Sequence, residues 1–151
     1  MKQRKAWQGI LTAAGLAALT IAGGCESGIS DEDIEETSVV GVRAKQADLG
    51  ENRQAILLID SRSAAAYRER HIVGAINYTL AHAPTSKTAP DARLLGYDAI
   101  VVYGNNRGDN GAKGLTKRLL ELDYEDVLWF SGGLEEWTLA GGETEGALAK
   151  P

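Results

Sequence analysis

Three short runs of consecutive apolar and aromatic residues constrain the fold of this 151-residue chain most strongly. They are Ile56–Ile59, Ile100–Tyr103 and Val127–Phe130. Each run has the length of a strand and lacks polar alternation, which is typical of a strand buried on both faces. Segments of helical character separate the runs, the clearest at 112–122. Strands that alternate with helices predict an α/β fold, in which a parallel sheet carries helices on both faces.

The remaining elements are shorter and less distinctive. We expect strands at 39–42 and 75–78, a helix at 63–70 with Ser61 or Ser63 as its N-cap, and a last helix at about 134–140. Segment 80–95 contains Pro84 and Pro90 and reads mostly as loop.

Three motifs lie at the ends of these elements. Asp60-Ser61-Arg62 closes the first run, and His71-Ile72-Val73-Gly74-Ala75-Ile76-Asn77 follows nine residues later. Gly132-Gly133-Leu134-Glu135-Glu136-Trp137 comes after the last run. In this order and spacing the set resembles the rhodanese (sulfurtransferase) domain over residues 39–142. The resemblance implies a roughly five-stranded parallel sheet flanked by helices on both faces.

The residues of these motifs also have structural interpretations. We expect the Asp60 carboxylate to accept hydrogen bonds from backbone N–H groups. We expect Arg62 to pair either with Asp60 or with a neighbouring acidic residue. A lone histidine such as His71 is more often a structural hydrogen-bonding group than a ligand. Tight turns and core packing are the expected roles of the other motif residues, Gly74, Gly132, Gly133 and Trp137.

The chemistry of the resembled family depends on the loop after the strand that here ends at Tyr103. In that family a cysteine follows the strand, and backbone N–H groups of the loop stabilise its thiolate. Here the equivalent position is Gly104, and the loop continues as Asn105, Asn106, Arg107, Gly108, Asp109, Asn110 and Gly111. Because the loop has no thiol or hydroxyl, the site is degenerate at Gly104 and we expect no catalytic residue in it. Persulfide and cysteine-phosphatase chemistry both need that nucleophile.

The loop could still bind a ligand or a partner. Its N–H groups at the start of helix 112–122 could hold an anion, although Asp109 opposes this. Asp109 with Asn105, Asn106 or Asn110 could hold Ca²⁺, but the EF-hand spacing is absent. The alternative is a polar loop that is exposed or contacts a protein. Arg107-Gly108-Asp109 matches a known adhesion tripeptide, but a match of three residues is expected by chance.

The N-terminal segment reads as a targeting signal. Lys2, Arg4 and Lys5 precede an uncharged stretch from Ala6 to Gly24, and Cys25 follows directly. A basic end, an apolar run and small residues describe a secretory signal. The segment Ala22-Gly23-Gly24-Cys25 resembles the lipobox of bacterial lipoproteins, which implies cleavage before Cys25 and lipid attachment to it. An uncleaved anchor helix or ordinary secretion is the alternative.

These features predict four parts. Residues 1–24 are a lipoprotein signal peptide, 25–38 the lipidated cysteine and an acidic tether, 39–142 the rhodanese-like domain, and 143–151 a C-terminal tail. Five acids lie within positions 31–36, which is typical of an extended, solvated spacer, with an acidic docking strip as the alternative. The expected location is the bacterial cell envelope, on the outside of the cytoplasmic membrane or in the periplasm at the outer membrane.

Composition excludes several classes of function. The net charge of −5 argues against nucleic acid as a partner, because phosphate binding needs a basic face. One cysteine and two histidines argue against a zinc site or a redox pair, so we expect no metal and no cofactor. Two hypotheses remain. The first is a non-catalytic binding or scaffolding module with an unknown protein partner. The second is a sulfurtransferase-related enzyme that uses a partner's thiol or another site, for which Asp60, His71, Tyr103 and Asp109 are polar candidates.

Overall fold

The computed structural model describes residues 28–47 and 56–148. Its main feature is a parallel sheet in the order β1-β6-β5-β2-β4. The five strands are β1 (Glu35–Thr37), β2 (Leu57–Asp60), β4 (Ile76–Asn77), β5 (Ile100–Tyr103) and β6 (Val127–Phe130). The predicted five-stranded parallel sheet is confirmed, and the three apolar runs form its three inner strands.

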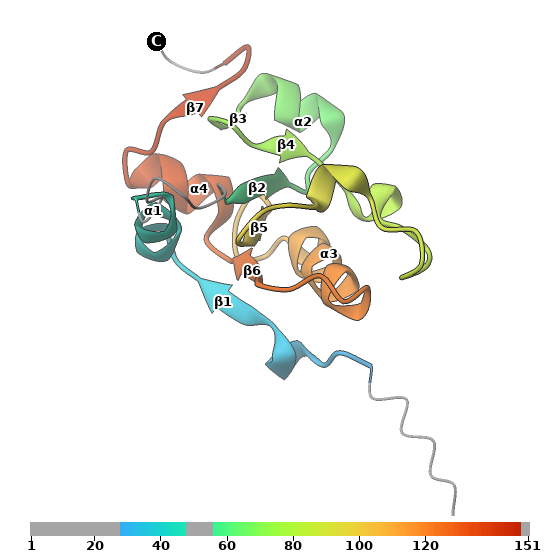
Figure 1. The fold of residues 1–151 in the computed structure, drawn as a ribbon. Coiled ribbons are helices and arrows are strands. Elements are labelled where there is room, and N and C mark those ends of the chain that lie inside the picture. The colour runs from blue at the N-terminus through green and yellow to red at the C-terminus, as the bar shows by residue number, and fades with distance from the viewer. Residues whose placement is uncertain (1–27, 48–55, 149–151) are drawn as a thin grey trace, which may run out of the picture.

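Helices cover both faces of this sheet (Figure 1). The α-helices are α1 (Val39–Ala47), α2 (Ala64–Glu69), α3 (Asn110–Glu121) and α4 (Gly133–Leu139). Short 3₁₀ turns lie at η1 (Asp31–Asp33), η2 (Leu80–His82) and η3 (Ala92–Leu94). Helices α1 and α4 pack on one face and α3 packs on the other.

Alternation along the inner strands builds two separate cores. In β5, Val101 and Tyr103 point to the α1 and α4 side, whereas Ile100 and Val102 point to the α3 side. All four side chains are buried, with at most 3% exposed. A run with no polar residue is therefore required, because each strand residue enters one core or the other.

The first strand is not where the sequence predicted it. Residues 39–42 form the start of α1, and the strand instead lies at Glu35–Thr37, inside the segment expected to be a spacer. Strand β1 pairs with β6 through Glu35 with Leu128 and Thr37 with Phe130. The sheet therefore begins at residue 35, four residues before the expected start of the domain at 39. Charged side chains are common on a short edge strand, where they discourage pairing with other chains.

The end of the chain also belongs to the fold. Strand β7 (Thr144–Glu145) pairs antiparallel with β3 (His71–Ile72) as a separate two-stranded sheet. Beyond it, the N–H groups of Ala147 and Leu148 donate to carbonyls at the end of α2. Residues 144–148 of the expected C-terminal tail therefore pack against β3 and α2.

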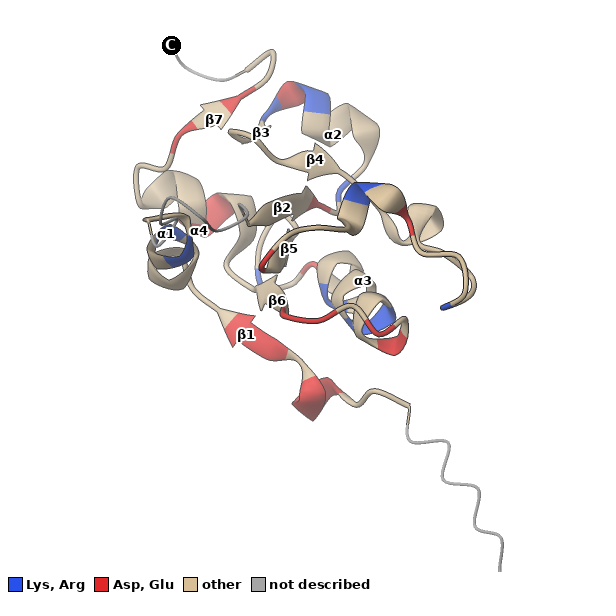
Figure 2. Cartoon of the chain, viewed as in Figure 1, with Lys and Arg blue, Asp and Glu red and all other residues tan. Residues whose placement is uncertain are grey.

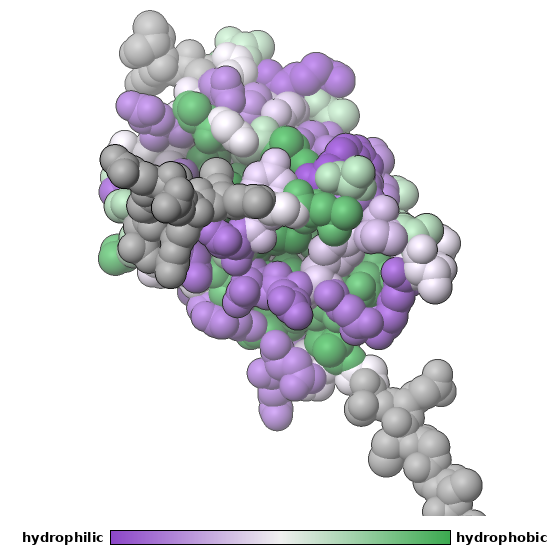
Figure 3. Space-filling model, viewed as in Figure 1, coloured by the Kyte–Doolittle hydropathy of each residue, from purple (hydrophilic) through white to green (hydrophobic). Residues whose placement is uncertain are grey.

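Surface charge is uneven. Acidic residues gather on η1 and β1 (Figure 2), and that part of the molecule is hydrophilic in Figure 3. Asp31 pairs with Lys113 of α3 at 2.7 Å, which ties the acidic segment to the folded body.

Candidate functional site

The loop after β5 lies at the carboxyl edge of the sheet, where open parallel sheets commonly bind ligands. It begins at buried Gly104 and runs to Asp109, the N-cap of α3. Helix α3 starts at Asn110, two residues before the predicted start. An aspartate just before a helical pattern is a standard N-cap signal, and it could have identified this role for Asp109.

The Asp109 carboxylate covers Gly104. Its Oδ2 accepts the N–H of Asn105 at 2.9 Å, and its Oδ1 accepts the N–H of Gly111 at 3.0 Å. A Cβ atom placed on Gly104 would lie 2.5 Å from Asp109 Cγ and 2.8 Å from Asp109 Cβ. The carboxylate therefore occupies the space that a side chain at position 104 would need.

The start of α4 holds the loop from the other side. The N–H groups of Leu134 and Glu135 donate to the carbonyl oxygens of Gly104 and Asn105, at 3.0 and 2.9 Å. This close approach requires glycine at position 133, whose φ is +60°. A Cβ atom on Gly133 would lie 2.6 Å from the Gly104 carbonyl oxygen. The predicted role of Gly133 in a tight turn therefore also includes contact with the loop.

The tip of the loop is anchored by side chains. Arg107 pairs with Glu36 of β1 at 2.6 Å, and Asn106 donates to Glu135 of α4 at 2.9 Å. Glu36 also accepts a short hydrogen bond from Ser131. That bond lowers the pKa of Glu36, with a smaller contribution from Arg107, against the opposing effect of burial. The Arg107 and Asp109 side chains therefore both have intramolecular partners.

Asp60 and Arg62 form a buried ion pair behind the loop. Arg62 Nη2 lies 2.6 Å from Asp60 Oδ2, and the Arg62 N–H donates to Asp60 Oδ1 at 2.9 Å. Arg62 thus pairs with Asp60, one of the two kinds of partner that the sequence left open. The Asp60 side chain is fully buried and that of Arg62 is 11% exposed. Burial opposes the charge of Arg62, but the hydrogen bonds and charge of Asp60 outweigh it and raise the Arg62 pKa. Asn77 Nδ2 completes the motif by donating to the carbonyls of Asp60 and Arg62.

Tyr103 lies beside this pair in the core. It is fully buried, and its hydroxyl oxygen accepts the N–H of Ile72 at 3.0 Å. Burial raises the Tyr103 pKa well above the ordinary value, and the charge of Asp60 adds to this. The phenol is therefore a neutral structural group at physiological pH.

His71 makes structural contacts with α2 and β7. Its ring stacks on Tyr67 with centroids 3.7 Å apart, its Nδ1 lies 2.7 Å from the Tyr67 carbonyl, and its Nε2 lies 3.3 Å from Glu145. Gly74 follows with φ of +77° in the turn between β3 and β4. Of the four polar candidates, Asp60 and Tyr103 are neighbours, whereas His71 and Asp109 each have hydrogen-bond partners of their own.

In the closing motif Trp137 packs in the core as predicted, whereas Gly132 has ordinary right-handed helical dihedral angles. Trp137 is 5% exposed in the core and donates its indole N–H to the Glu143 carbonyl at 2.9 Å. Gly132 precedes α4, and a Cβ atom there would meet the side chain of Glu136.

Two further features concern ligands and membranes. Within 28–47 and 56–148, no three His, Cys, Asp or Glu side chains are grouped so that they could hold a metal ion. In the same residues no helix is long and apolar enough to cross a membrane. Cys25 and the segment 1–24 lie outside the described residues.

Solved structures share this architecture. The BH2092 protein from Bacillus halodurans is 29% identical with a TM-score of 0.63, over 76% of this chain and 79% of that one. A thiosulfate sulfurtransferase from Pseudomonas aeruginosa is 29% identical with a TM-score of 0.58, over 75% of this chain but 20% of that one. RPA3614 from Rhodopseudomonas palustris, described as a possible tyrosine phosphatase, shares the fold at 21% identity and a TM-score of 0.59, over 76% and 87%.

The comparison with curated proteins returned no significant match. The family model described as a rhodanese-like domain matches residues 43–140, which is more than half of the chain. The match includes β2, β5, β6 and the loop from Gly104 to Asp109. The chain therefore belongs to the rhodanese-like domain family.

Proposed function

We propose that this chain is a non-catalytic rhodanese-like binding module, held in the bacterial cell envelope by lipid on Cys25. The observation that carries the proposal is the Asp109 carboxylate above Gly104. Position 104 supplies no nucleophile, and Asp109 fills the space in which a reactive side chain would stand.

The hydrogen bonds of the loop support the same conclusion. A persulfide or a bound oxyanion needs free N–H donors. The N–H groups of Asn105 and Gly111 already donate to Asp109. A second negative charge beside this carboxylate would be repelled over a short distance in a partly desolvated site.

Sulfur transfer from thiosulfate to cyanide, with thiocyanate and sulfite as products, tests the absence of catalysis. The full chain, purified in a non-ionic detergent, is expected to form no thiocyanate above the uncatalysed rate. Gly104→Cys alone is expected to remain inactive because the new side chain meets Asp109. Gly104→Cys/Asp109→Ser is expected to gain activity, since serine keeps the N-cap and frees the space for the thiol.

Asp109→Ser alone is the matched control and is expected to be inactive. Turnover by the native chain would contradict the proposal and favour an enzyme that uses another thiol or another site. A folded but inactive double variant would show that position 104 does not correspond to the nucleophile position.

The tether is tested separately by cell fractionation. In a bacterial host grown with radiolabelled palmitate, the native chain is expected in the membrane fraction and to carry the label, and Cys25→Ser is expected to lose the label. Ser27→Ala is the control and is expected to behave as the native chain. A native chain that lies in the membrane fraction without the label would favour an uncleaved anchor helix instead.

A further inference from the structure

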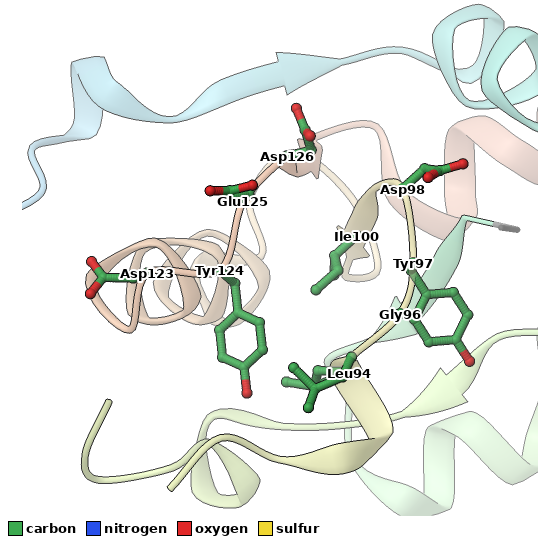
Figure 4. A pocket seen from close by; sticks show the side chains of 10 residues that line it. Leu94, Gly96, Tyr97, Asp98, Ile100, Asp123, Tyr124, Glu125 and Asp126 are labelled. Atoms are coloured by element: carbon green, nitrogen blue, oxygen red, sulfur yellow. The ribbon is translucent and has the colours of Figure 1, made fainter. Parts of the chain in front are cut away.

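A hollow lies at the end of the sheet opposite to the loop 104–111. Its walls are residues 94–98, which lead into β5, and residues 123–126, which lead into β6 (Figure 4). Its volume is about 360 Å³. That volume is at the lower end of the range for ligand pockets and suits one or two side chains of a partner. We call it the amino-end hollow, because it lies at the amino ends of both strands.

Apolar side chains form part of the lining of the amino-end hollow, and the rest of its surface is polar. Leu94 and Ile100 are 2% and 3% exposed, and Figure 4 shows them facing the space together with the ring of Tyr124. Leu95 and Tyr97 also line it, although they are 51% and 42% exposed. Large apolar side chains left in water around a concave surface are typical of recognition sites.

The rim of the amino-end hollow is acidic. Asp98 stands on one wall, and Asp123, Glu125 and Asp126 stand on the other. None of the ten lining residues is Lys, Arg or His. Asp123 pairs with Lys87 at 2.7 Å, in a contact in which both side chains are more than half exposed. Figure 2 shows acidic residues just before β5 and just before β6.

We infer that the amino-end hollow docks a short basic segment of a partner protein, in which a large apolar side chain is flanked by Lys or Arg. The apolar side chain would contact Leu95, Tyr97 and Tyr124, and the cations would face the carboxylates of the rim. Charge complementarity selects this occupant. An anionic ligand would be repelled, and a second copy of this chain, with its net charge of −5, would bring acid against acid.

This surface is independent of the proposed function, since it lies at the other end of the sheet from Gly104 and Asp109. A partner could therefore occupy the amino-end hollow while the loop 104–111 stays free.

Fluorescence anisotropy of a dye-labelled peptide tests the inference. The probe is the amidated tripeptide Lys-Phe-Lys, titrated with the full chain in non-ionic detergent at low salt. Binding is expected to weaken about fivefold in Asp98→Lys, which reverses a charge of the rim. It is expected to weaken about fivefold also in Tyr97→Ala, which removes an exposed ring from the lining. Raising the salt is expected to weaken it further, because exposed charges are screened.

The controls separate docking from general attraction between opposite charges. Glu32→Lys reverses a charge on the exposed turn η1, far from the hollow in the sequence, and is expected to change affinity less than twofold. Labelled Glu-Phe-Glu is expected not to bind the chain. Detergent without the chain is expected not to bind labelled Lys-Phe-Lys. Equal weakening by Glu32→Lys and Asp98→Lys, or no binding of Lys-Phe-Lys, would overturn the inference. Self-association that Tyr97→Ala abolishes would assign the hollow to a second copy instead.

Discussion

At the scale of single residues, the space above Gly104 depends on a few atoms. Asp109 fills this space from the α3 side, and Gly133 lets α4 approach from the other side. Both residues act through backbone groups of the loop. The shape of the loop therefore depends on positions that are separated by more than twenty residues in the chain.

Gly133→Ala is expected to lower the free energy of unfolding by more than about 2 kcal/mol. A left-handed conformation costs a non-glycine residue about 1–2 kcal/mol, and the new Cβ atom would also meet the Gly104 carbonyl oxygen. Gly74→Ala is the matched control, since Gly74 has φ of +77° but open space around it. Urea denaturation measures both. A loss in Gly133→Ala no larger than that in Gly74→Ala would contradict the contact.

At the scale of elements, two segments without strong sequence patterns are held by polar contacts. Strand β1 joins the sheet at its edge and places Glu36 between Ser131 and Arg107. The connection from β4 to β5 is held by Asp91, which pairs with Arg93 at 2.6 Å and accepts the Tyr78 hydroxyl at 3.2 Å. We therefore expect removal of β1 to affect the first set of contacts, and a change in pH to affect the contacts of Asp91.

A chain that begins at Ser38 is expected to be less stable than one that begins at Gly28. The shorter chain lacks β1, whose three residues all pair with β6. Hydrogen bonds contribute about 1 kcal/mol each, so the loss in unfolding free energy is expected to be about 2–3 kcal/mol by urea denaturation. Equal stability of the two chains would mean that residues 28–37 are a spacer after all.

Asp91→Asn is expected to destabilise the fold at pH 6 but not at pH 2. Hydrogen bonds from Arg93 lower the Asp91 pKa from 3.8 to about 2, although burial opposes this. Ionised Asp91 therefore stabilises the folded state above pH 4, and this contribution is lost as the pH falls toward 2. Thermal unfolding of both proteins at the two pH values measures the effect. The same difference in stability at both pH values would exclude this ionisation as its cause.

At the scale of the whole molecule, stability depends on a sheet buried between two cores. Val101 lies in β5 at the centre of the sheet and is fully buried. The cores on the two faces share the inner strands, so damage to one of these strands affects both.

Val101→Asp is expected to abolish the cooperative unfolding transition. Burying an unpaired charge costs several kcal/mol, which approaches the entire stability of about 5–15 kcal/mol of a domain. Val40→Asp is the control, because Val40 is 72% exposed, and its effect is expected to stay within about 0.5 kcal/mol. Circular dichroism on heating distinguishes the two. A cooperative transition in Val101→Asp would contradict the assignment of β5.

The sequence predicted the inner strands well and the edges poorly. β5 and β6 have the predicted bounds, because only a strand buried on both faces needs four apolar residues in succession. Val39 and Val40 favour strand by propensity, yet they begin α1, in which Val42 packs into the core. Strands β1, β3 and β7 have two or three residues each. Their signal is too short to distinguish from loop, and charge at β1 indicated a spacer.

The sequence by itself determined the α/β class, the order of the inner elements, the family motifs and the absence of Cys, Ser and Thr from residues 104–111. These are properties of single residues and of local periodicity, which can be read along the chain. Only the tertiary structure decided that β1 and β7 join sheets, that Asp109 covers Gly104, and that acidic and apolar residues meet at the amino-end hollow. Each of these depends on the packing of separate segments in three dimensions. No local sequence pattern specifies the distance between residues that lie far apart in the chain.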